Sequence, residues 1–92
     1  MTTKAPAEIK YFDENEAIKK LYSVIDELSD LIPVSNDRNR LSFNLDLYLR
    51  GEVINVLEAI IQASPRSSTV KYAELEKIIE KKFSEKGIVK NN

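Results

Sequence analysis

Eight residues of the chain alternate strictly between polar and apolar side chains: Arg40-Leu41-Ser42-Phe43-Asn44-Leu45-Asp46-Leu47. Their apolar side chains stand at positions 41, 43, 45 and 47, and their polar side chains stand at 40, 42, 44 and 46. Because successive side chains of a strand point to opposite faces, this alternation predicts a strand with one buried face. A lone strand leaves its backbone hydrogen-bonding groups unpaired, so we expect the same strand of a second chain beside it.

Helical patterns lie on both sides of this stretch. Residues 13–32 carry one narrow apolar stripe, Asp13 and Glu16 have the spacing of a capping box, and Pro33 ends the helix. Residues 47–63 and 70–86 predict two further helices, separated by the polar break at 64–69 and followed by Gly87 as a stop. Gly51 costs about 1 kcal/mol relative to Ala inside a helix, which indicates close packing or a shifted helix start.

Residues 40–87, read as strand, helix, turn and helix, resemble the ribbon-helix-helix family of DNA-binding proteins, which includes MetJ-like and Arc-like proteins. The resemblance implies a mainly α homodimer, with one short strand and two core helices in each chain, preceded here by an extra N-terminal amphipathic helix. The expected division is a flexible arm at 1–12, the N-terminal helix at 13–32, a linker at 33–39, the family domain at 40–87 and a tail at 88–92. The turn at 63–67 contains no glycine, which departs from the family pattern.

In that family the paired strands enter the major groove of double-stranded DNA and read bases from alternating positions. The resemblance therefore implies that Arg40, Ser42 and Asn44 contact bases, since Arg suits guanine, Asn suits adenine and Ser accommodates either role. Asp46, on the same face, is expected to cap the next helix. The four apolar residues of the strand would form the dimer core: Leu41, Phe43, Leu45 and Leu47.

A phosphate clamp at the start of the last helix is the second feature that the resemblance implies. Hydroxyl and backbone N–H groups there, together with the helix dipole, favour an anion. The expected phosphate contacts are Arg66, Ser67, Ser68, Thr69 and Lys71.

The N-terminal helix lies outside the minimal unit of the family. Its stripe needs a partner surface, and three alternatives stay open: it packs on the core, pairs with itself or docks another protein. The candidate partner-binding residues of this stripe are Ile18, Leu21, Tyr22, Ile25 and Leu28.

Composition excludes several classes of function. The chain has no His, no Cys and only two Gly, so we expect no enzyme, no metal site and no cofactor. The net charge of −1 divides into −4 over residues 1–37 and +3 over residues 38–92. Lys, Glu and Ile occur ten times each, a usage that fits a thermophile. The chain lacks cysteine and any apolar run of about 18 residues, which predicts a cytoplasmic protein that does not bind a membrane.

The expected function is that of a dimeric, site-specific DNA-binding protein, either a transcriptional regulator or a DNA-partition adaptor with a possible protein partner at its N-terminal region. The alternative is an all-helical protein–protein interaction adaptor without DNA binding. Its helices would span residues 14–32, about 41–63 and 69–86, and the alternation at 40–47 would be accidental. A third possibility is a helix-turn-helix protein that reads DNA with residues 69–86.

Overall fold

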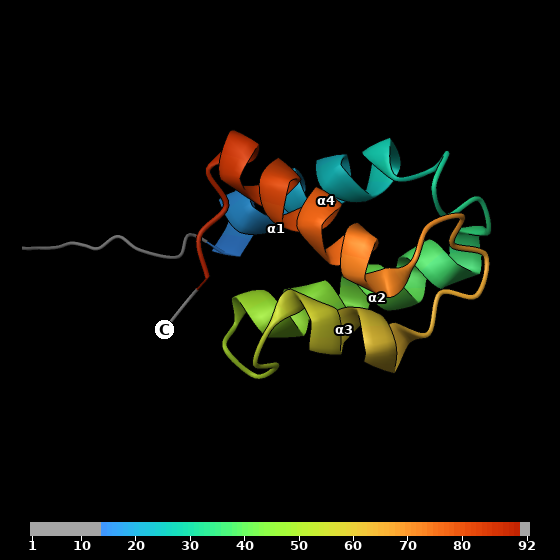
Figure 1. Cartoon of the computed structure of the whole chain (residues 1–92). Coiled ribbons are helices and arrows are strands. Elements are labelled where there is room, and N and C mark those ends of the chain that lie inside the picture. Colours follow the sequence, from blue (N-terminus) through green and yellow to red (C-terminus); the bar gives the residue numbers. More distant parts are fainter. Residues whose placement is uncertain (1–13, 91–92) are drawn as a thin grey trace, which may run out of the picture.

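The computed structural model describes residues 14–90, and this part of the chain forms four helices. Consecutive helices run in opposite directions, so that both connections α1–α2 and α3–α4 lie at one end of the molecule (Figure 1). Helix α2 packs on α1 and α3, and α4 packs on α3 and α1. The helices are α1 (Glu14–Glu27), α2 (Ser35–Leu49), α3 (Val56–Ala63) and α4 (Tyr72–Lys86).

The predicted ribbon-helix-helix fold is wrong, because residues 40–47 lie inside α2 and no strand forms anywhere in residues 14–90. The local reason is composition. Residues 35–49 contain none of the β-branched residues that favour strands (Val, Ile and Thr), whereas they contain four Leu, a good helix former. Leu41, Leu45 and Leu49 recur every four residues and are buried along one face of the helix. The alternation at 40–47 is therefore accidental.

The predicted linker and the predicted second helix also differ from the structure. Helix α2 begins at Ser35, inside the expected linker at 33–39, and it ends at Leu49, inside the helix expected at 47–63. Gly51 follows with a φ of 87°, and its N–H bonds to the carbonyl of Tyr48 while the N–H of Glu52 bonds to that of Leu47. These two bonds are a Schellman motif, so Gly51 stops α2 instead of lying within a helix.

The ends of the last two helices follow from local hydrogen bonds. The Asn55 side chain accepts a bond of 2.8 Å from the N–H of Glu58 and caps α3. Helix α4 begins after Lys71 without a side-chain cap. Gly87, with a φ of 69°, ends α4 as the sequence predicts.

The core lies between the four helices and unites their apolar faces. Helix α1 contributes Leu21, Ile25 and Leu28 of the stripe that the sequence indicates, whereas Ile18 and Tyr22 lie outside the buried cluster. Burial of this set is the main stabilising contribution to the fold. The buried cluster consists of Leu21, Val24, Ile25, Leu28, Ile32, Leu41, Leu45, Leu49, Val53, Val56, Ala59, Ile60, Ala63, Leu75, Ile79 and Phe83.

The arm expected at 1–12 and the last two residues of the expected tail lie outside the described residues. Ile88 of the tail packs against the core cluster. Over residues 14–90, no helix has both the length and the apolar character needed to cross a bilayer.

Candidate functional site

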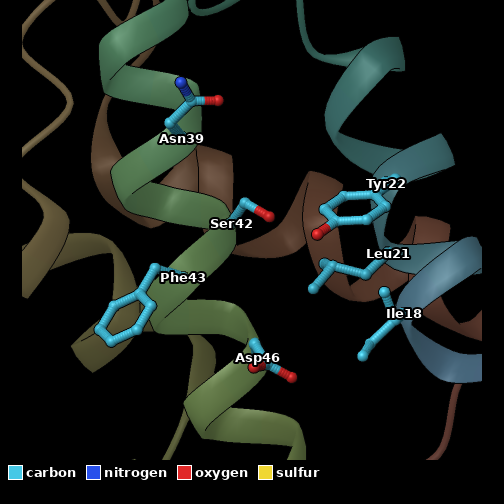
Figure 2. Close-up of a pocket in the computed structure, with 7 residues that line it drawn as sticks. All are labelled: Ile18, Leu21, Tyr22, Asn39, Ser42, Phe43 and Asp46. Atoms are coloured by element: carbon cyan, nitrogen blue, oxygen red, sulfur yellow. The ribbon is translucent and has the colours of Figure 1, made fainter. Parts of the chain in front are cut away.

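A partly apolar groove lies between α1 and α2 on the described surface. It has a volume of about 240 Å³. Leu21 and Tyr22 point from α1 toward α2, and Ser42 points back toward α1, whereas the ring of Phe43 points away from α1 at the outer edge (Figure 2). We call this feature the α1–α2 groove, and its lining residues are Ile18, Leu21, Tyr22, Asn39, Ser42, Phe43 and Asp46.

Two aromatic side chains at this groove are unusually exposed. Tyr22 is 59% exposed and Phe43 is 65% exposed, although Leu21 between the two helices is buried. Exposed aromatic rings next to an apolar depression are characteristic of protein interaction sites, because they bury a large area at little conformational cost. The arrangement therefore has the means to bind an apolar side chain of another molecule.

The electrostatics of the groove are nearly neutral. Asp46 is the one charged residue among the described residues that line it, and Arg50 holds this carboxylate through Nε at 3.1 and 3.2 Å. Asp46 thus pairs with the residue that follows α2, and its expected role as a cap of the next helix is wrong, because Asn55 caps α3. Asn39 and Ser42 add neutral hydrogen-bonding groups at the rim.

The expected dimer core is divided between two sides of α2. Leu41 and Leu45 are fully buried within the chain, Leu47 is half-buried against the same core, and Phe43 is exposed. In a helix, positions 41 and 45 share a face, but position 43 lies about 200° around the axis from position 41. The four residues therefore do not form one surface.

Of the three expected base-contacting residues, Arg40 and Asn44 lie one turn apart on one side of α2, and Ser42 lies on another. Arg40 Nε donates to the Ala63 carbonyl at 3.0 Å, and Asn44 Nδ2 donates to the Arg40 carbonyl at 3.0 Å. Ser42 lies on another side of α2, at the α1–α2 groove. Arg40 thus ties α2 to the end of α3, and the three side chains present no common reading face.

The expected phosphate clamp is occupied by a carboxylate of the chain itself. Asp37, which is 7% exposed, accepts a hydrogen bond of 2.9 Å from the N–H of Ser67. It also forms an ion pair with Arg40. The hydroxyl and backbone N–H of Ser67, followed by Arg40, hold the pKa of the Asp37 carboxyl below its ordinary value.

Ser68 and Thr69, the neighbours of Ser67 in the expected clamp, also form hydrogen bonds within the chain. Ser68 Oγ bonds to Val70 at 2.7 Å, and the N–H of Thr69 donates to the carbonyl of Leu31 at 2.8 Å. Arg66 and Lys71 are exposed on this loop. The loop between α3 and α4 is therefore a structural tie to the α1–α2 connection.

Of the expected partner-binding residues, three belong to the core. Leu21, Ile25 and Leu28 are buried against the other helices, so packing on the core is the alternative that the structure shows for them. Leu21 also reaches the floor of the α1–α2 groove, and Ile18 and Tyr22 line it. The sequence stripe therefore contributes to both the core and the groove.

A second pocket, of about 330 Å³, lies where the C-terminal residues cross α2 and α4. The Tyr48 ring stacks on Phe83 with centroids 6.3 Å apart, and Lys90 Nζ lies 5.2 Å from the centre of the Tyr48 ring. Lys90 also donates to the Ile54 carbonyl at 3.1 Å. Burial and then the charge of Glu80 raise the pKa of Tyr48. Internal contacts therefore brace this pocket, which makes it the weaker candidate.

Residues 14–90 bring together no group of three or more acidic side chains that could hold a metal ion. No match to the chain was found among protein-family models, curated proteins or solved structures.

Proposed function

We propose that the chain is a protein–protein interaction adaptor, whose α1–α2 groove binds an apolar side chain of a protein partner. The observation that carries this proposal is the pair of exposed aromatic residues, Tyr22 and Phe43, beside a depression floored by Leu21. This is the all-helical alternative that the sequence left open. Site-specific DNA binding stays a prediction, but its expected base contacts lie on two sides of α2, and Ser67, Ser68 and Thr69 of the expected phosphate clamp make hydrogen bonds within the chain.

Tyr22 and Phe43 both leave most of a large aromatic side chain exposed to water. Large aromatic rings that stay in water forgo about 1.5–3 kcal/mol of burial each, which a partner surface would recover. The groove offers a concave apolar floor, neutral hydrogen-bonding groups and one internally paired charge, so its desolvation costs little.

The test is selection of binding peptides from a phage-displayed random library, followed by titration of the selected peptides into the isotope-labelled protein. We expect selected peptides to carry an aromatic or large aliphatic anchor and to shift the amide signals of residues 18–22 and 39–46. Tyr22→Lys should weaken binding by roughly tenfold or more, as loss of an anchor contact does.

Ile61→Lys is the matched control, because Ile61 is an exposed apolar residue of α3 that does not line the groove. Peptides that bind Tyr22→Lys and the native chain equally well would contradict the proposal. Binding to genomic DNA fragments that weakens as salt rises, with no peptide selected, would favour the DNA-binding alternative instead.

A further inference from the structure

The α1–α2 groove and the ring of Phe43 lie side by side on one surface of the chain. Phe43 cannot fill the groove of its own chain, because its ring points away from α1 while the adjacent Ser42 points into the groove (Figure 2). The same surface thus carries a projecting aromatic ring, 65% exposed, and an apolar depression lined by Ile18, Leu21 and Tyr22.

We propose that the occupant of the groove is a second copy of the chain, with Phe43 of each copy inserted into the groove of the other. A two-fold dimer uses the same patch on both copies, so a residue i that contacts j is repeated as j contacting i. The Phe43 ring beside the α1–α2 groove meets this requirement. A single two-fold rotation places Phe43 of each copy in the groove of the other. This inference rests on the proposed function of the groove and names its partner.

The charges of the groove favour a second copy. Near a two-fold axis each residue approaches its own equivalent, so an unpaired charge would meet its like and repel it. In a chain with 32% charged residues, Asp46 is the one charge among the described lining residues, and Arg50, directly after α2, forms an ion pair with it. Asn39 and Ser42 can face their own equivalents without repulsion, since amide and hydroxyl groups both donate and accept.

The size of the chain gives a further reason. A chain of 92 residues has a limited core, and association of two copies is a common way to bury more apolar surface. In the dimer, Phe43 and Tyr22 would both leave water, which removes the two largest exposed aromatic rings of the described surface at once.

The first experiment measures mass by sedimentation equilibrium from micromolar to millimolar concentration. We expect a reversible dimer, and we expect Phe43→Lys to weaken the dimer by roughly tenfold or more while helix content, measured by circular dichroism, stays unchanged. Ile61→Lys, at an exposed apolar position outside the groove, should leave the dimer unaffected. A chain that stays monomeric at millimolar concentration, or a dimer weakened equally by both substitutions, would overturn the inference.

The second experiment identifies the contact. In a mixture of carbon-13-labelled and unlabelled chains, an isotope-filtered nuclear Overhauser spectrum should show contacts between chains from the Phe43 ring to the methyl groups of Ile18 and Leu21. A dimer without these contacts would overturn the inference. If the chain is monomeric and aromatic peptides still bind the groove, the interaction function stands and only the second copy is excluded; if no peptide binds either, both fail.

Discussion

Asp37 and Ser67 lie thirty positions apart in the sequence, yet the N–H of Ser67 donates a hydrogen bond of 2.9 Å to the Asp37 carboxylate. This contact joins the start of α2 to the loop between α3 and α4. Ser67 Oγ also accepts a bond of 3.3 Å from the N–H of Val34. Asp37, Ser67 and Arg40 therefore close one end of the helical bundle.

Stability should fall in acid because of this carboxylate. The pKa of Asp37 is lowered in the folded chain, so its stabilising contribution is present above the unfolded value of about 4 and is lost as pH falls through the folded value. Thermal unfolding of the native chain and Asp37→Asn should show the variant less stable at neutral pH and less sensitive to acid. Asp30→Asn, at an exposed site, is the control; an unchanged acid response in Asp37→Asn would contradict this prediction.

Substitutions at positions 43 and 45 distinguish a helix over residues 40–47 from the strand that the sequence predicts. Leu45 is fully buried, so Leu45→Ala should lower the free energy of unfolding by about 2–5 kcal/mol, whereas Phe43→Ala at an exposed position should change it by less than about 0.5 kcal/mol in the monomer. Urea unfolding of dilute protein measures both values. In a ribbon, both side chains would face the dimer core, and similar losses at the two positions would argue for it.

Arg40 should act as a structural residue. Arg40→Ala removes the bond to the Ala63 carbonyl and the pair with Asp37, and we expect a loss of about 1–3 kcal/mol in the free energy of unfolding. Asn44→Ala removes one bond within the same helix and should cost less than about 0.5 kcal/mol. Urea unfolding measures both losses, and a loss below about 0.5 kcal/mol for Arg40→Ala would show that its contacts to Ala63 and Asp37 do not stabilise the fold.

Gly51 should resist substitution because of its backbone conformation. With a φ of 87°, it lies in the region where side chains other than glycine are strained, and Gly51→Ala should lower the free energy of unfolding by roughly 1–2 kcal/mol. Gly51→Asn should lose less, since Asn tolerates the left-handed region better. A gain in stability from Gly51→Ala would instead indicate a continuous helix through residues 47–63.

The helices at the two ends of the chain could be predicted, because their signals are local. The apolar stripe of α1 and the glycine that ends α4 both act within a few residues, and the structure has helices at Glu14–Glu27 and Tyr72–Lys86. Helix α1 ends at Glu27, however, whereas the sequence predicts that it continues to residue 32, before Pro33. The break after Leu49 also had a local cause in Gly51, but its meaning was ambiguous between close packing in a helix and a helix end.

The secondary structure of residues 40–47 could not be read unambiguously from their pattern. Their alternation satisfies the two-residue period of a strand, while Leu41, Leu45 and Leu49 equally satisfy a helix with four-residue spacing. The absence of β-branched residues over Ser35–Leu49 was the local signal that favoured the helix.

The tertiary structure decided the rest, because a helix turns alternate side chains to different sides. It buried Leu41 and Leu45, left Phe43 in solvent beside the groove and placed Arg40 against the end of α3. The sequence alone predicts an amphipathic helix toward each end of the chain, and it contains no His and no Cys. Helix α2 packs against α1 and α3, and this packing brings together residues that are far apart in the chain. The packing determines which side chains of α2 face the core and which remain exposed.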